Sequence, residues 1–174
     1  ALELDPAFTD ASVGLSIILN DLGRYEDGRQ VFEEAQKILR SRTNLEDPYM
    51  NEKFALKHDE LGEMYIQHNR PKEALEQFYK ALHISSRKPE LTMKIVECFS
   101  RVGAPERAIK ELKDLIRDYP GFQSARIRLG RMLFESGDVA HAVDQWEAVL
   151  QRDPSHAEAQ RLIRQSQAMN DLHI

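Results

Sequence analysis

LGEMYIQHNRPKEALEQFYKAL (61–82) contains two stretches of apolar residues at helical spacing, with His-Asn-Arg-Pro between them. Apolar residues that recur every three to four positions predict helices with one buried face. Asn69 lies at the break, and asparagine tolerates the left-handed backbone conformation that ends a helix. Ala74 is small enough to let two helix axes approach, and Phe78 can fill the space beside it. The stretch therefore predicts two short antiparallel helices joined by a tight turn.

The same pattern recurs along the 174-residue chain. The repeated stretches are LGRYEDGRQVFEEA (22–35), HNRPKEALEQFYKA (68–81), VGAPERAIKELKDL (102–115) and SGDVAHAVDQWEAV (136–149). Their second, seventh and eleventh positions hold a turn residue (Gly23, Asn69, Gly103, Gly137), a small residue (Gly28, Ala74, Ala108, Ala142) and a large apolar residue (Phe32, Phe78, Leu112, Trp146). A spacing of 34 residues separates Asn69 from Gly103 and Gly103 from Gly137. Because one helix pair cannot bury its apolar face alone, such repeats must stack.

These residues resemble the tetratricopeptide repeat, a helix–turn–helix unit of 34 residues. Two copies carry residues of the family signature, at Leu61, Gly62, Tyr65, Ala74, Phe78 and Ala81, and at Leu129, Gly130, Ala142, Trp146 and Pro154. His58, Val96 and Leu115 depart from the pattern, and we interpret His58 as a half-buried packing residue. The resemblance implies an all-α fold, a right-handed superhelical solenoid of antiparallel helix pairs with a C-terminal capping helix.

The repeat register divides the chain, which we expect to form a single domain over residues 1–174. Its segments are a stub of a preceding repeat (1–8), repeat 1 (9–42), an insertion or helix extension (43–54), repeat 2 (55–88), repeat 3 (89–122), repeat 4 (123–156), and a capping helix with a tail (157–174). The opening ALELDP (1–6) matches the end of a family repeat. We expect either a fragment of a longer array or a degenerate cap there, and a natural end at the polar C-terminal helix.

The segment around SRTNLEDPYMNE (41–52) breaks the period. Asp47-Pro48 is a good helix start, because Asp caps free amides and Pro suits the first turn. We expect a loop near residues 43–46 and a long helix from Pro48 to His68. Insertions in solenoids often lie on a binding face, whereas longer loops also cost little. Both a functional insertion and a tolerated change of length fit the sequence.

Composition and motifs argue against several classes of function. The net charge of −5 disfavours nucleic-acid binding, and no apolar run is long enough to cross a membrane. The single cysteine, Cys98, cannot form an internal disulfide. The six histidines are scattered, and metal-site spacings, phosphate loops and nucleophile motifs are absent. We therefore expect no enzyme activity, no metal and no cofactor, and we predict a cytoplasmic protein.

The family resemblance implies a concave groove lined by the first helices of successive pairs. The implied groove residues are Asp10, Val13, Ile17, Asp59, Glu60, Glu63, Met93, Lys94, Glu97, Arg101, Ile127, Arg128, Arg131, Phe134 and Arg161. Read in this order, the groove is acidic at its start and basic at its end, which favours a partner of complementary polarity. Ordinary solvated helix faces would show similar charges.

Three functions follow from this interpretation. The leading one is a non-enzymatic adaptor or scaffold that binds a peptide or helix of another protein in a signalling or assembly complex. The second is self-association through VGLSIIL (13–19), which is apolar nearly all round. The third is a substrate-recruiting part of a larger enzyme. A clamp for the free carboxylate of chaperone tails is not expected, because Val13, Ile17 and Glu60 stand at its family positions, and Asp59 and Glu63 in a shifted frame.

Overall fold

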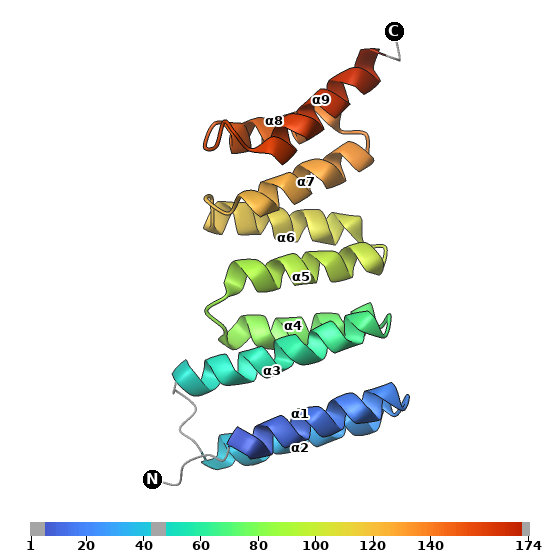
Figure 1. Ribbon diagram of the computed structural model, residues 1–174, viewed down its shortest axis with the longest axis vertical. Coiled ribbons are helices and arrows are strands. Elements are labelled where there is room, and N and C mark those ends of the chain that lie inside the picture. Colours follow the sequence, from blue (N-terminus) through green and yellow to red (C-terminus); the bar gives the residue numbers. More distant parts are fainter. Residues whose placement is uncertain (1–5, 43–47, 172–174) are drawn as a thin grey trace. The chain divides into compact units, whose positions relative to one another are not determined.

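The computed structural model describes residues 6–42 and 48–171, and the regular structure in these ranges is helical throughout. The helices are α1 (Pro6–Asp21), α2 (Tyr25–Arg42), α3 (Pro48–Gln67), α4 (Pro71–Ile84), α5 (Lys88–Arg101), α6 (Pro105–Asp118), α7 (Gln123–Glu135), α8 (Val139–Leu150) and α9 (Ala157–Asp171). The chain forms two compact units, residues 1–91 and 92–174. In each unit, successive helices run in opposite directions (Figure 1). The predicted all-α fold of antiparallel helix pairs is confirmed.

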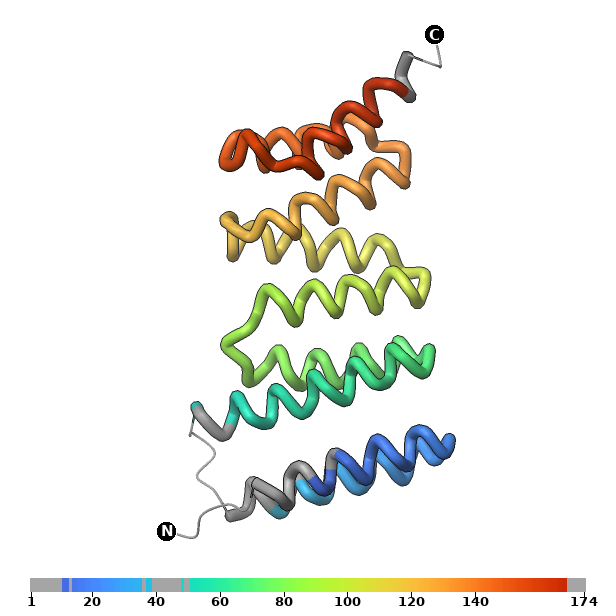
Figure 2. The backbone as a smooth tube through the Cα atoms, in the orientation of Figure 1, coloured from blue at the N-terminus to red at the C-terminus, as the bar shows by residue number. Residues whose placement is uncertain are grey.

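The turns within the helix pairs lie at the predicted positions, as the tube in Figure 2 makes easy to follow. Gly23, Asn69, Gly103 and Gly137 all adopt positive φ angles, between 55° at Asn69 and 90° at Gly137. After each of them, the next residue donates its backbone N–H to the carbonyl five positions back, as from Arg70 to Tyr65 at 2.8 Å. This closing bond is the one that satisfies a free carbonyl at a helix end. The turn residue therefore stops one helix and directs the chain into the next.

Close packing between paired helices depends on the predicted small and large residues. A Cβ atom added at Gly62 would lie 2.5 Å from Cε1 of Phe78, and one at Gly130 would collide with the indole ring of Trp146. Phe78 and Trp146 are each 1% exposed, and the Trp146 Nε1 donates to the Ile127 carbonyl at 3.4 Å. The family signature glycines thus give each large ring its space. The interpretation of Trp146 as a core residue is confirmed.

The long third helix begins at Pro48, as predicted, and ends at Gln67, one residue before the predicted end. The predicted loop near 43–46 lies outside the described residues. Glu52, on the first turns of α3, accepts hydrogen bonds from the Ser85 hydroxyl and the Ser86 backbone N–H, both at 2.9 Å, and from Arg87 Nε at 3.3 Å. One residue of the predicted insertion or helix extension (43–54) is therefore hydrogen-bonded to the connection between α4 and α5.

His58 is more deeply buried than the half-buried residue expected from the sequence, with 1% exposure. Its Nδ1 lies 2.8 Å from Gln77 Oε1 on α4, and its ring stands edge-on to Phe32 of α2 with centroids 5.0 Å apart. A buried polar ring requires such a partner, because an unpaired group would lose its hydration without compensation. His58 thus joins α3 to both α4 and α2 as a packing residue.

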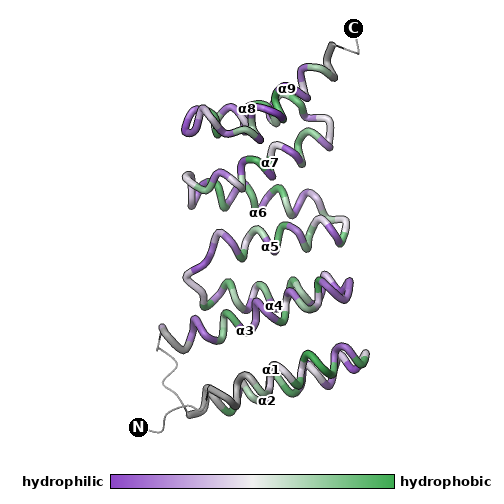
Figure 3. Tube along the Cα trace, in the orientation of Figure 1, coloured by the Kyte–Doolittle hydropathy of each residue, from purple (hydrophilic) through white to green (hydrophobic). Residues whose placement is uncertain are grey.

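Helix α1 buries polar residues together with Leu19 and exposes other apolar residues. Ser16 and Asn20 are fully buried, whereas Leu15, Ile18 and Leu22 are 47%, 56% and 69% exposed. Figure 3 shows the hydrophobic colouring toward the C-terminal end of this helix. The buried side faces Gly28 of α2, where an added Cβ would lie 2.9 Å from the Ser16 carbonyl oxygen. Small residues allow this close approach, and the bulky ones are left on the outside.

Candidate functional site

The groove residues predicted in the first unit are partly committed to internal contacts. Asp59 is only 5% exposed and accepts a hydrogen bond from Arg87 Nη1 at 3.2 Å. Glu60 is exposed and pairs with Lys57 at 3.1 Å, while Ile17 and Glu63 are half-buried. The side chains of Asp10 and Val13 lie outside the described part of the structure. Asp59 therefore stabilises the fold. Glu60 is more exposed than Asp59 and Glu63, the other predicted acidic residues whose side chains the structure describes here.

The predicted residues of α5 and the first half of α7 form an ion-pair cluster. Glu97 accepts from Arg101 Nε at 2.9 Å and from Arg128 Nη2 at 3.3 Å. Arg128 also donates to the Ser100 hydroxyl at 3.2 Å. Met93 and Lys94 are half-buried on the same helix as Glu97, and Ile127 is 7% exposed. One carboxylate thus offsets two guanidinium groups, which leaves a moderate positive charge on this surface.

Three predicted residues, Arg131, Phe134 and Arg161, come together in one pocket of the second unit. The pocket has a volume of about 320 Å³. Its other lining residues, which were not among the predicted groove residues, are Glu135, Trp146, Leu162 and Gln165. They come from α7, α8 and α9, so only the tertiary fold assembles them.

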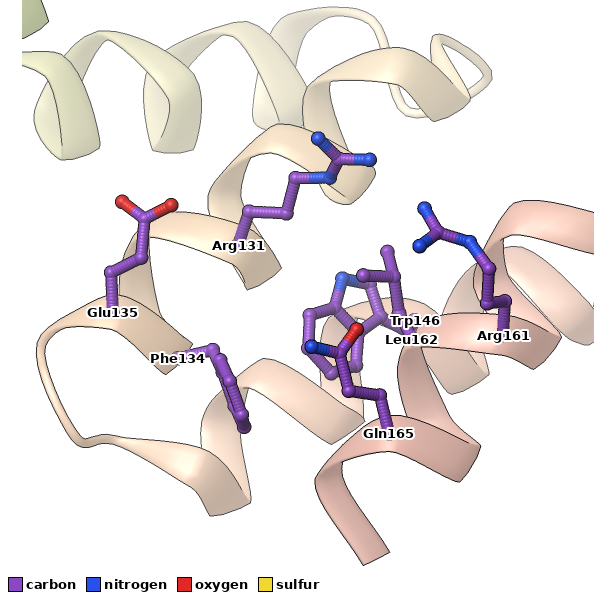
Figure 4. A pocket seen from close by; sticks show the side chains of 7 residues that line it. All are labelled: Arg131, Phe134, Glu135, Trp146, Arg161, Leu162 and Gln165. Atoms are coloured by element: carbon purple, nitrogen blue, oxygen red, sulfur yellow. The ribbon is translucent and has the colours of Figure 1, made fainter. Parts of the chain in front are cut away.

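The pocket has an apolar base and charged edges. Figure 4 shows Trp146 and Leu162 at the base, with the guanidinium groups of Arg131 and Arg161 reaching toward each other from α7 and α9. Phe134 contacts the Trp146 ring with centroids 5.9 Å apart and extends the apolar surface. The shape suits an apolar side chain with an anionic neighbour.

The two arginines of the pocket differ in how they are paired. Arg131 Nη2 donates to the Glu158 carboxylate, and Arg131 Nε is buried without an acceptor in the described residues. Arg161 is exposed, and no ion pair involves it within residues 6–42 and 48–171. Glu135 is exposed at the opposite side of the pocket from Arg161 (Figure 4). Arg161 is therefore the cation most available to a ligand.

The described residues offer no metal site, no exposed thiol and no helix that could span a membrane. Among the described residues, no group of three or more His, Cys, Asp or Glu side chains is placed to hold a metal ion. Cys98 is fully buried on α5. No described helix is both long and apolar enough to cross a membrane.

Comparison with known proteins agrees with the repeat architecture. A family model described as Tetratricopeptide repeat matches residues 101–166. A small glutamine-rich tetratricopeptide repeat-containing protein 2 from Mycosarcoma maydis is 31% identical over 83 residues, which are 48% of this chain and 24% of that protein. The match thus spans about a quarter of that relative's length.

Solved structures show the same fold. The first tetratricopeptide repeat domain of Spaghetti (RPAP3), bound to an HSP90 peptide, has a TM-score of 0.58 and 22% identity, over 68% of this chain and 95% of that one. YrrB, described as a tetratricopeptide repeat protein with an unusual peptide-binding site, has a TM-score of 0.59 and 22% identity, over 95% and 84% of the two chains. A tetratricopeptide repeat model thus matches residues 101–166, and the resemblance of the chain to this family is confirmed.

Proposed function

We propose that this protein is a non-enzymatic interaction adaptor that binds a segment of another protein in the pocket formed by Arg131, Phe134, Trp146, Arg161 and Leu162. The observation that carries the proposal is the convergence of an exposed, unpaired arginine with an apolar base in one pocket. The segment would insert an apolar side chain and place a carboxylate near Arg161. Its place in a signalling or assembly complex, and the cytoplasmic location predicted from the sequence, stay predictions.

The apolar base and the exposed arginine of this pocket would contribute different amounts of binding free energy. Burial of one large apolar side chain contributes about 1.5–3 kcal/mol. An ion pair at an exposed arginine contributes about 0–1 kcal/mol and weakens with salt. The apolar base would therefore supply most of the affinity, while Arg161 would orient the segment and select for acidic neighbours.

The structures of related fold support a protein ligand, since one of them holds an HSP90 peptide. The way in which that structure binds its peptide is not expected in this chain. The positions that would form a carboxylate clamp hold Val13, Ile17 and Glu60 in one frame, and Asp59 and Glu63 in the next. Asp59 is in addition buried against Arg87. We therefore expect the partner segment to bind without needing a free C-terminal carboxylate.

A paired capture from native cell extract tests the proposal. One bait is the wild-type chain and the second carries Phe134→Ala with Arg161→Glu. The matched control is Arg164→Glu, which makes the same charge change at an exposed position of α9 outside the pocket. Circular dichroism first establishes that all three fold. A partner held by wild type and control but lost from the pocket variant supports the proposal, and one held equally by all three contradicts it.

Self-association is a second candidate, favoured by the exposed apolar side of α1. Leu15, Ile18 and Leu22 recur at helical spacing and are all more than 45% exposed. Exposed apolar patches of this kind mark surfaces that another protein covers. Sedimentation velocity over a wide concentration range tests this function, and a monomer at every concentration contradicts it.

A further inference from the structure

A second pocket, of about 350 Å³, lies in the unit of residues 92–174, between α6, α7 and α8. Its apolar lining comes from Ile116 on α6 and from Leu129 and Leu133 on α7. Ile116 is half-buried, whereas Leu129 and Leu133 are 3% and 9% exposed. The floor of this pocket is therefore part of the packed core and its α6 wall is partly open.

The two pockets use different faces of α7. This second pocket is lined by Leu129 and Leu133, whereas the first is lined by Arg131, Phe134 and Glu135. With 3.6 residues per turn, these two groups point in nearly opposite directions from the helix axis. A ligand in one pocket thus leaves the other accessible.

Two cations line the second pocket and form no ion pair within the described residues, although the charge of Lys113 acts on Asp138. Lys113 on α6 is exposed and takes part in no ion pair within the described ranges. Arg126 Nη1 donates to Gln145 Oε1 at 3.1 Å, a neutral acceptor, and its Nε is buried with no acceptor in the same ranges. Both cations can therefore still accept a carboxylate as a partner.

The acidic group of the pocket is already engaged elsewhere. Asp138 caps the N-terminus of α8, accepting from the His141 backbone N–H at 3.4 Å, and its carboxylate lies 2.8 Å from His141 Nδ1. The hydrogen bond from His141 lowers the pKa of Asp138, and the charge of Lys113 adds to this effect. Asp138 is thus ionised at neutral pH and occupied by the helix cap, so it does not pair directly with Arg126.

We propose that this α6–α7–α8 pocket binds an acidic segment of a second partner protein. One bulky apolar side chain of the segment lies against Ile116, Leu129 and Leu133, and neighbouring carboxylates pair with both Lys113 and Arg126. Charge complementarity selects an acidic ligand, and the spread of the cations over two helices selects a chain segment over a small anion. The site stands apart from the pocket of the proposed function and would make the unit bivalent.

Nuclear magnetic resonance titration of the full ¹⁵N-labelled chain tests this site. The probe is a short peptide, blocked at both ends, with central leucines flanked by glutamates. The control probes are the same peptide with lysines in place of the glutamates, and sodium acetate at matched carboxylate concentration. We expect saturable shifts of the amides of Ile116, Leu129 and Gln145 with the acidic peptide alone.

A matched pair of variants tests whether the peptide-induced amide shifts depend on the charge of Lys113. Lys113→Glu is expected to weaken binding at least about fivefold, because it replaces an attraction by a repulsion. Lys110→Glu makes the same change at an exposed position of α6 outside the pocket and is expected to bind within about twofold of wild type. Both positions are exposed, so both variants are expected to fold.

Five results would overturn the site. Four of them are the absence of saturable shifts, equal binding of the lysine peptide, equal shifts with acetate, and unchanged binding by Lys113→Glu. Shifts confined to Arg131, Phe134 and Arg161 would also overturn it, since they would place the peptide in the first pocket. The double variant Phe134→Ala with Arg161→Glu alters only the first pocket. It should show the same peptide-induced shift of the Ile116 amide as wild type.

Discussion

Helix α1 and helix α9 distribute polarity in opposite ways. Helix α9 buries Ala159 and Leu162, at 0% and 8% exposure, and exposes Arg161 and Arg164. Helix α1 buries the polar Ser16 and Asn20 beside Leu19, and it exposes the apolar Leu15 and Ile18. Two amphipathic helices can thus use opposite faces for packing, depending on how close their neighbour comes. The outer face of α9 is therefore polar, whereas α1 presents apolar side chains that a second protein can cover.

Replacing Trp146 by alanine should have the largest effect, because it removes the packing of α8 on α7 and the part of the pocket base that Trp146 forms beside Leu162 of α9. Loss of a fully buried tryptophan costs about 3–5 kcal/mol, and Trp146 is 1% exposed. We expect hydrogen exchange to rise first in α8 and α9 and the urea midpoint by circular dichroism to fall. Trp146→Phe should cost clearly less. Equal stability of the alanine variant and wild type would show that the fold does not depend on this packing.

Ile18→Glu should remove the apolar character of the outer side of α1. If a second copy covers this side, a buried glutamate weakens the dimer at least about tenfold, equivalent to about 1.4 kcal/mol. Sedimentation velocity measures the change, and Gln30→Glu, at an exposed position of α2, is the matched control. Dimerisation of Ile18→Glu with wild-type affinity would place the contact elsewhere.

Glu52→Gln should weaken the polar connection between α3 and the turn before α5. We expect a loss of about 1 kcal/mol at pH 7, at the low end for hydrogen bonds to charged groups because the carboxylate is 38% exposed. The backbone N–H of Ser86 lowers the pKa of Glu52 below its ordinary value of 4.5. Its stabilisation is therefore complete above pH 4.5 and is lost as the pH falls through the lowered pKa.

The matching measurement is urea unfolding of wild type and Glu52→Gln at several pH values. The difference in unfolding free energy should shrink in acid, where the wild-type carboxylate becomes protonated. A difference that stays constant over the whole acid range in which wild type remains folded would show that the charge of Glu52 is not responsible.

Leu22→Gln should have the smallest effect on stability. Leu22 is 69% exposed, and surface substitutions usually change stability by less than about 0.5 kcal/mol. Thermal unfolding of the dilute chain checks this prediction. A large loss would mean that the outer side of α1 has a partner within the chain itself.

Local features of the fold could be predicted from the sequence because their causes lie within a few residues. The turns at Asn69 and the three turn glycines could be predicted from the backbone conformations that these residue types prefer. Pro48 predicted the start of α3. The family pattern included both Gly62 and Phe78 as signature residues, and the structure packs them against each other. In each case a residue type has few alternatives at its position, so the pattern was informative.

The candidate site was only partly predictable, because it depends on contacts between distant residues. Helical spacing placed Asp59 on a predicted groove, but it could not reveal the hydrogen bond from Arg87, 28 residues later. Arg131 and Phe134 were included, whereas Glu135 and Gln165 share their pocket only through the packing of α9 on α7 and α8. The positions of polar surface residues follow no period in the sequence. The contacts of Asp59 with Arg87 and of Glu135 and Gln165 with the pocket could therefore not be predicted.

The hydrogen bonds of Arg87 limit where the chain can change length. Arg87 donates to Glu52 at 3.3 Å and to Asp59 at 3.2 Å, two carboxylates seven residues apart on one face of α3. One residue inserted between them would rotate Glu52 about 100° around the helix axis, away from Arg87. Relatives of this chain should therefore conserve the spacing from Glu52 to Asp59, even where the segment before Pro48 is longer or shorter.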